Sequence, residues 1–183
     1  DLYFQGRALQ NRGVTPALLA QARNFFARSL ALDPGNIEAA VAAAQVDVSV
    51  GSAFMADDIH TYFNVAEAAL NRALLQAPNH PRAHMLLGAV QIQTGRIDNG
   101  IAQCRRSLAL DRNLADAHGF LGLGKYQSGR SEEVEGHIQE ALRLSPRDTR
   151  AFLWYMFVGL GKLSIKADRE AVEDMRHRVH GII

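Results

Sequence analysis

The stretch Leu108-Ala109-Leu110-Asp111-Arg112 returns 34 residues later as Leu142-Arg143-Leu144-Ser145-Pro146. The equivalent position 34 residues before Arg112 is Pro78, and an earlier copy, Leu30-Ala31-Leu32-Asp33-Pro34, ends 44 residues before that proline. The longer interval indicates the same period with an insertion of about ten residues. A fixed period of this length is typical of stacked helical units, each of which covers its apolar face with its neighbour.

The residues inside one period predict two helices joined by a tight turn. Between positions 115 and 128, small or apolar residues recur at 117, 120, 121 and 124, the spacing that gives a helix one apolar face. Ser128-Gly129-Arg130 ends this helix, and Ser131 with two following glutamates provides the start of the next one. Thr94-Gly95-Arg96 repeats the turn 34 residues earlier.

Particular positions in each period resemble the tetratricopeptide repeat family. The third copy carries four residues where the family favours Leu, Gly, Ala and Pro: Leu121, Gly122, Ala141 and Pro146. The second copy has Leu87 and Gly88 at the matching positions, and the first complete copy has Ala66, Leu70, Ala73 and Pro78. Three copies in register are a specific signal, whereas one copy is not.

The resemblance implies an all-α fold, a right-handed superhelical solenoid of about nine helices in antiparallel pairs. We expect a single repeat domain over 7–183. It would consist of a half repeat at 15–34, a repeat at 37–78 that holds the insertion, and repeats at 81–112, 115–146 and 149–180. Gly88 and Gly122 fall in the middle of helices, where a missing side chain lets two helices approach closely.

The first six residues, Asp1 to Gly6, resemble the recognition site of the tobacco etch virus protease, so we interpret 1–6 as an expression scar. A scar followed at once by half a repeat suggests that the chain is a piece of a longer protein. Phrases around Leu142 and Trp154 resemble the C-terminal repeat arrays of bacterial class III adenylate or guanylate cyclases, which would make this piece the regulatory arm of a signalling enzyme.

Composition gives few clues to a partner. The formal net charge of +1 gives no reason to expect nucleic acid or an acidic membrane surface as a partner, and no apolar run reaches the roughly 20 residues of a membrane-spanning helix. Cys104 is the only cysteine, which excludes an internal disulfide and fits a reducing, cytoplasmic location. Its interior place in a helix predicts a buried, unreactive thiol.

Catalytic and metal-binding patterns are absent from the sequence. It contains no Gly-rich phosphate loop, no Gly-x-Ser-x-Gly and no His-Glu-x-x-His, so we expect no enzymatic activity in this segment and no cofactor. His84 and His118 lie 34 residues apart on equivalent helices, but stacked helices hold such side chains about 10 Å apart, too far for one metal ion. We interpret both histidines as packing residues.

The family binds its partners along the concave surface formed by the first helix of each repeat. The groove positions that the resemblance implies are Val41, Gln45, Met85, Ala89, Ile92, Leu123, Tyr126, Leu153, Trp154, Phe157 and Leu160. Such a groove is mostly apolar and lacks the Lys and Asn clamp of chaperone-tail receptors. It suits an apolar or amphipathic protein segment, or alternatively a small apolar ligand if the groove closes into a pocket.

Two further surfaces are candidates for binding. The insertion, residues 50–58, carries Phe54 and Met55 and has two interpretations, which can both hold. It is a binding loop, or it extends the following helix, which would begin near Asp57 or Asp58 and cover the half repeat with Ile59, Tyr62 and Phe63. The segment from Ala151 to Val158 is apolar all round, which predicts a homodimer through the C-terminal repeat if nothing within the chain covers Trp154 and Phe157.

Overall fold

The computed structural model describes residues 1–53, 55–147 and 151–180, with the side chains of residues 152 and 171–180 outside the description. Nine α-helices and one short 3₁₀ helix, η1, make up this part of the chain, which contains no strand. Their bounds are α1 Leu2–Arg12, α2 Pro16–Leu32, α3 Ile37–Ser52, α4 Ile59–Gln76, α5 Pro81–Gln93, α6 Ile97–Leu110, α7 Ala115–Gln127, η1 Ser131–Glu133, α8 Val134–Leu144 and α9 Ala151–His180.

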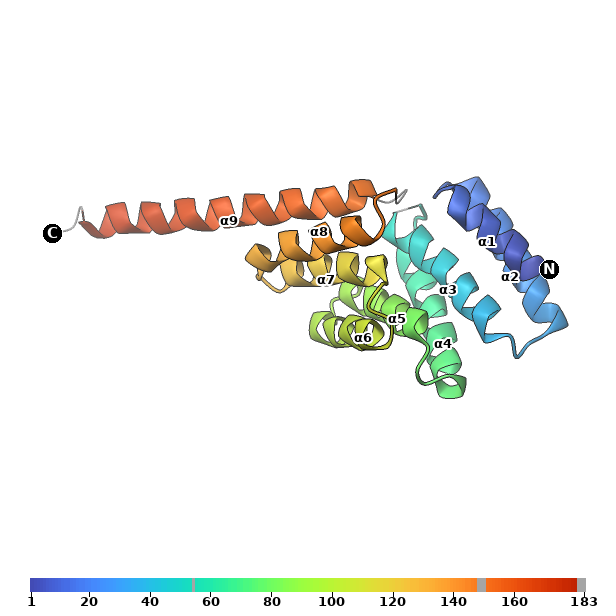
Figure 1. Cartoon of the computed structure of the whole chain (residues 1–183). Helices are drawn as coiled ribbons and strands as arrows, with labels where there is room; N and C mark the ends of the chain where they lie inside the picture. The colour runs from blue at the N-terminus through green and yellow to red at the C-terminus, as the bar shows by residue number, and fades with distance from the viewer. Residues whose placement is uncertain (54, 148–150, 181–183) are drawn as a thin grey trace.

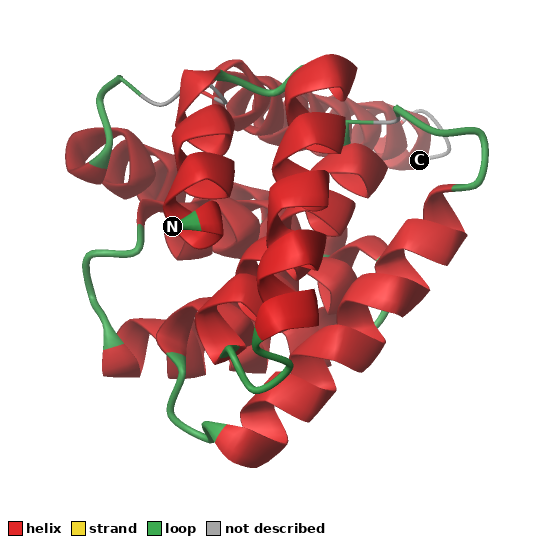
Figure 2. Ribbon diagram, turned by 90° about the vertical axis from the view of Figure 1, so that its right-hand side faces the viewer, coloured by secondary structure: helices red, strands yellow, loops and turns green. Residues whose placement is uncertain are grey.

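The helices stack in chain order as antiparallel pairs (Figure 1). The first helices of the pairs, α1, α3, α5, α7 and α9, each contact the next one along the stack. Each second helix packs against its own first helix and against the first helix of the following pair. Figure 2 shows the same stack from another side, with only helices and loops in the described part of the chain. The expected solenoid of helix pairs is therefore confirmed.

The turns inside the α5–α6 and α7–α8 repeats each depend on a glycine in the left-handed conformation. Gly95 and Gly129 have φ angles of 84° and 74°, which suit glycine because it has no Cβ. The amide of Arg96 donates to the carbonyl of Gln91 at 2.8 Å and that of Gly95 to Ile92 at 3.2 Å, the Schellman pattern that ends a helix. The amides of Arg130 and Gly129 make the equivalent bonds one period later.

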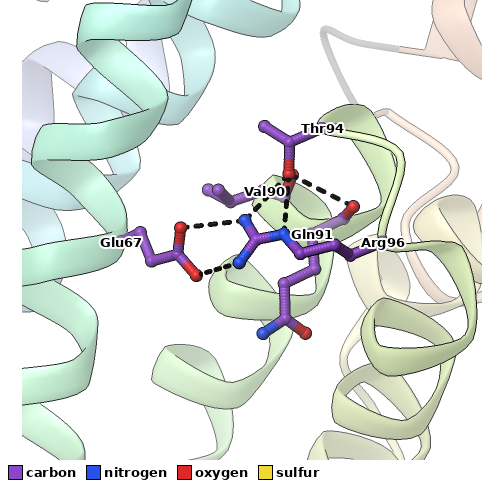
Figure 3. A network of polar contacts seen from close by, with 5 residues as sticks. All are labelled: Glu67, Val90, Gln91, Thr94 and Arg96. Carbon is purple, nitrogen blue, oxygen red and sulfur yellow. Dashed lines mark hydrogen bonds and ion pairs between the residues drawn. The ribbon is translucent and has the colours of Figure 1, made fainter.

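A polar network fastens the turn of the second repeat to the repeat before it (Figure 3). The Arg96 guanidinium donates to both carboxylate oxygens of Glu67 on α4, at 2.6 and 2.8 Å, and this contact raises the pKa of Arg96. Arg96 also donates to the Thr94 hydroxyl, which in turn donates to the Val90 carbonyl at 2.8 Å. The paired, bidentate geometry fixes the orientation of α4 relative to the turn.

The repeated phrase itself forms the turn between repeats. The same kind of backbone hydrogen bond, from an amide to the carbonyl three residues earlier, closes three of the junctions. It joins Asn36 to Asp33, His80 to Ala77 and Leu114 to Asp111. The next helix then begins with a cap: the Asn36 side chain accepts from the Ala39 amide at 2.9 Å. The repeated sequence therefore coincides with the turn that connects one repeat to the next.

Glycines allow the helices of one repeat to touch at the backbone. A Cβ on Gly88 would lie 2.6 Å from the Cys104 sulfur and 2.8 Å from the Gly100 carbonyl oxygen, so α5 and α6 cross with almost nothing between them. A Cβ on Gly122 would lie 2.7 Å from the end of the Ile138 side chain on α8. The close approach of two helices predicted at Gly88 and at Gly122 is thus confirmed.

The insertion lengthens two helices as well as a loop. α3 has 16 residues against 13 in α5, and α4 has 18 against 14 in α6. Asp58 caps α4 by accepting from the Thr61 amide at 3.2 Å, which fits the predicted start of that helix. Phe63 lies over Gly51, so closely that a Cβ added to the glycine would lie 2.6 Å from the ring. Phe63 belongs to the main core, and Ile59 packs against it. The expectation that these two residues cover the half repeat is therefore wrong.

The two ends of the stack differ from the sequence prediction. The helix predicted alone at the N-terminus, α2, has a partner, because residues 2–12 form α1 and Tyr3 packs against the Phe26 ring at a centroid distance of 6.1 Å. At the other end, the repeat predicted at 149–180 is one continuous helix, α9. Leu163 stands one period after Gly129, and a residue with a Cβ does not favour the left-handed turn that would end the helix there.

Candidate binding groove

An apolar cavity of about 540 Å³ lies against the first helices of the stack. Its walls come from α3, α5, α7 and α9, together with the start of α4 and the insertion loop. The apolar side chains that line it include Val48, Met55, Ile59, Phe63, Leu86, Phe120, Leu153, Trp154, Met156 and Phe157. Val14 from the loop between α1 and α2 also lines it, so both ends of the stack contribute to one hollow.

Close aromatic packing holds the wall formed by α9. The Trp154 ring lies over Gly119 of α7, where a Cβ would come within 2.5 Å of the indole. Phe120 meets the indole edge-on at a centroid distance of 5.7 Å, and Phe157 lies 5.8 Å from it. Because no side chain at Gly119 separates the two helices, the indole can fill the space between them.

These contacts correct the argument for a dimer. Trp154 is 2% exposed and Phe157 is 8% exposed, so the chain itself already covers most of both residues, with α7 packed directly against Trp154. The reason given for a dimer, that a second copy must cover these two residues, is therefore wrong. Among the described side chains of the same helix, Tyr155, Met156 and Leu163 are large, apolar and exposed.

A second, polar cavity of about 480 Å³ adjoins the apolar one. The two share the wall residues Val14, Gln45 and Ser49, and we call the two adjoining cavities together the groove. The polar part is lined by Arg7, Arg82 and Arg147, and by Asp116. The groove is therefore divided into an apolar half and a cationic half, and the expectation of a mostly apolar groove holds for one half only.

Hydrogen bonds gather at Gln45, where the two halves meet. Its amide oxygen accepts from Arg82 Nη2 at 2.6 Å and from Arg7 Nη1 at 3.1 Å. Arg7 also donates to Gln10 on its own helix, at 3.0 Å. Burial lowers the pKa of Arg82, and the neighbouring charge of Arg7 lowers it further, against the smaller favourable effects of Asp116 and Glu38. Both guanidinium groups remain charged at neutral pH.

The structure brings some of the predicted groove residues to the cavities. Gln45 and Met85 line the polar half, while Leu153, Trp154 and Phe157 line the apolar half with Gln45. Val41, Ala89, Ile92 and Leu123 instead lie in the core, where they are at most 8% exposed. Tyr126 and Leu160 pack partly buried against that core. For Ala89 and Ile92 the cause is that α5 is buried on nearly every side, so its apolar residues contact neighbouring helices.

The insertion contributes one described residue to the groove. Met55 lines the apolar half and also packs against the small cluster formed by α2 and α3. Phe54 lies outside the described residues. The insertion therefore lengthens the packed helices α3 and α4 and places Met55 in a cavity wall, while its role in binding stays a prediction.

Arg82 and Arg7 were not among the residues predicted for the groove. Arg82 lies three residues before Met85, on the same face of α5, and this helical spacing was a usable signal. Arg7 carried no such signal, because α1 was not predicted as a helix. The meeting of three separate helices at Gln45 is a tertiary contact that the period does not specify.

The histidines and the cysteine discussed from the sequence, His84, His118 and Cys104, have structural roles. His84 contacts Gln103 at 2.6 Å, and His118 contacts His137 at 3.5 Å, so each histidine joins the two helices of its own repeat. Cys104 is fully buried, and burial raises the pKa of its thiol to about 12. Across the described residues, no three metal-ligating side chains of His, Cys, Asp or Glu gather at one place. None of the described helices has the length and apolarity to cross a membrane.

No protein-family model matches the sequence. Over 131 residues the chain is 25% identical to the CTR9 homolog of Arabidopsis thaliana, a match that covers 63% of this chain and 12% of that protein. The chain thus spans about an eighth of the length of the curated relative it matches.

Several solved structures share the fold. A thermophilic TPR protein of Thermus thermophilus superimposes with a TM-score of 0.67 at 20% identity, over 87% of this chain and 79% of that one. MamA superimposes with a TM-score of 0.54 at 20% identity, over 96% of both chains. Together with the stacked helix pairs, these likenesses define the fold as a tetratricopeptide-type solenoid.

Proposed function

We propose that this chain is a non-catalytic interaction scaffold that holds a segment of another protein in its groove. The observation that carries the proposal is the groove itself, whose apolar and cationic halves share Gln45 and are lined by five first helices, α1, α3, α5, α7 and α9. A protein segment presents both kinds of side chain along its length, and an elongated hollow suits such a segment better than a compact molecule does.

A small apolar ligand is the second candidate. The apolar half alone has about 540 Å³, within the usual size of small-molecule sites, and it is walled by aromatic side chains. Native mass spectrometry of the purified protein tests this candidate. A retained small molecule that is absent from a Phe120→Ala variant would favour it over the peptide.

Selection from a random 12-residue peptide library on phage tests the scaffold proposal. The groove variant carries Leu153→Glu and Met156→Glu, which place charge in the apolar half at side chains that are not fully buried. The control carries Leu75→Glu at a side chain that is 83% exposed on α4, outside both cavities.

We expect peptides enriched on the wild-type protein to bind the control equally and the groove variant about tenfold less, or weaker still, a loss of about 1.4 kcal/mol. Absence of enriched peptides, or equal binding to both variants, would contradict the proposal.

We further propose that the segment belongs to a larger bacterial signalling protein inside the cell, and that copies of the chain associate through α9. Tyr155, Met156 and Leu163 support the association, because they leave apolar area exposed on one helix. Light scattering at high micromolar concentration tests it. A monomer, or a dimer that Tyr155→Glu with Leu163→Glu does not disrupt, would exclude association through this surface.

A further inference from the structure

At the junction of the two groove halves, two cationic side chains share one neutral acceptor. Arg7 and Arg82, from α1 and α5, both donate to the same neutral amide oxygen of Gln45. Two guanidinium groups that converge on one oxygen form a fork suited to a carboxylate, which offers two oxygens and a full negative charge. Asp116 and Glu38 also act on the charge of Arg82, but the oxygen on which both guanidinium groups converge is neutral, so a carboxylate bound there would be attracted by both cations.

The helix α3 sets the distance between this fork and the apolar half. Gln45 and Ser49 line both halves, whereas Ser52 lines only the apolar one. The step from Gln45 to Ser52 is about 10 Å at a rise of 1.5 Å per residue. An extended chain covers that distance in about three residues, at roughly 3.3 Å each.

The groove continues beyond the arginines on its polar side. The same cavity reaches Asn113 and Leu114 between α6 and α7, and Ser145 and Arg147 after α8. A bound segment can therefore run on past the fork in both directions. An acidic side chain within a segment, with chain on both sides of it, fits this geometry.

We propose that the groove selects an extended protein segment in which an internal Asp or Glu lies about three residues from a large apolar side chain. The carboxylate binds Arg7 and Arg82 beside Gln45, and the apolar side chain enters the cavity between Phe63, Phe120 and Trp154. This inference rests on the proposed scaffold function and specifies the ligand of the same groove.

The sequences of the selected 12-residue peptides provide the test. The double variant Arg7→Gln with Arg82→Gln removes both cations, and Arg72→Gln, at an exposed residue of α4, is the matched control. On the wild-type protein and on the control we expect enrichment of an acidic residue at a fixed spacing of about three from an apolar one. On the double variant the acidic residue should disappear while the apolar one persists.

A second variant keeps the test valid if the double variant folds poorly. Gln45→Glu supplies a carboxylate from within the chain, so it should raise the melting temperature and also abolish the preference for an acidic residue. On the wild-type protein, replacing the acidic residue of a selected peptide with its amide should weaken binding about tenfold or more, as loss of a charged hydrogen bond does.

The outcomes separate this inference from the function on which it rests. Peptides that need the groove but show no acidic position, or that keep it on the double variant or on Gln45→Glu, would overturn the inference and leave the scaffold intact. Failure to enrich any groove-dependent peptide would overturn both.

Discussion

Gly88 and Gly136 both lie inside helices, yet an added methyl group should have opposite effects at the two positions. At Gly88 the new Cβ would lie 2.8 Å from the Gly100 carbonyl oxygen, which belongs to the backbone of α6 and cannot turn away. At Gly136 nothing lies within 4 Å. Gly88→Ala should therefore destabilise the fold by about 1–3 kcal/mol, whereas Gly136→Ala should stabilise it by up to about 1 kcal/mol.

Urea unfolding of the two variants checks this pair. The change at Gly136 serves as the control for helix propensity alone. An equal effect of the same sign at both positions would show that α5 and α6 do not cross at Gly88.

Cys104 should be chemically silent in the folded protein. It is fully buried against Gly88, and burial raises the pKa of its thiol to about 12, so almost none of it is thiolate at pH 8. We expect no reaction with an aromatic disulfide reagent until denaturant unfolds the chain, after which one thiol per chain reacts. Rapid labelling of the native protein would contradict this packing.

Residues that follow the period were predictable, and residues that join distant helices were not. Gly88, Gly122 and Cys104 could be assigned to packing because the 34-residue spacing places them inside helices. The contact of Arg7 and Arg82 with Gln45 was not predictable, because it depends on how three repeats are oriented relative to one another.

At the scale of the helices, the α7–α8 pair should be sensitive to mild acid. Burial lowers the pKa of both His118 and His137 from the ordinary value of 6.5, and their proximity lowers that of His137 further. Between these lowered pKa values and pH 6.5, the unfolded chain therefore binds more protons than the folded chain does. Their contribution to stability is complete above pH 6.5 and is lost as the pH falls through that window.

Melting temperatures at pH 7.5 and 5.5 test this prediction. The wild-type protein should lose stability over this range, and the double variant His118→Gln with His137→Gln should lose less. Glu133 and Glu140 should not contribute to the change over this pH range, because Lys125 and Arg143 hold their pKa values below the ordinary range. A decline of equal size in both proteins would assign the sensitivity to other groups.

The helices that differed from prediction are those whose boundaries depend on something other than the period. α9 is one helix of 30 residues because Leu163 occupies the place of the turn glycine, a signal that was present in the sequence. α1 was missed because residues 2–6 were set aside as an expression scar, although they are helical and Tyr3 packs on Phe26. The expected number of about nine helices matches the described part of the chain only because these two differences cancel.

For the whole molecule, the repeat period was sufficient to predict the class of fold and the general location of the groove. It was not sufficient to predict the two halves of the groove. Superhelical curvature brings Val14 and the α9 side chains to the same cavity, and curvature results from many small packing angles between repeats. The predicted groove positions Val41, Ala89, Ile92 and Leu123 became core instead, since neighbouring first helices pack closely there.

The most direct test of the account is hydrogen exchange of the protein with and without a peptide selected on it, read by mass spectrometry. We predict slower exchange in the segments that line the groove, above all residues 45–53 of α3 and its loop and residues 153–157 of α9. Exchange in α6 and in the second half of α4, which lie outside both cavities, should not change. Protection confined to these outer helices, with none in the groove segments, would contradict the claim that the groove is the binding surface.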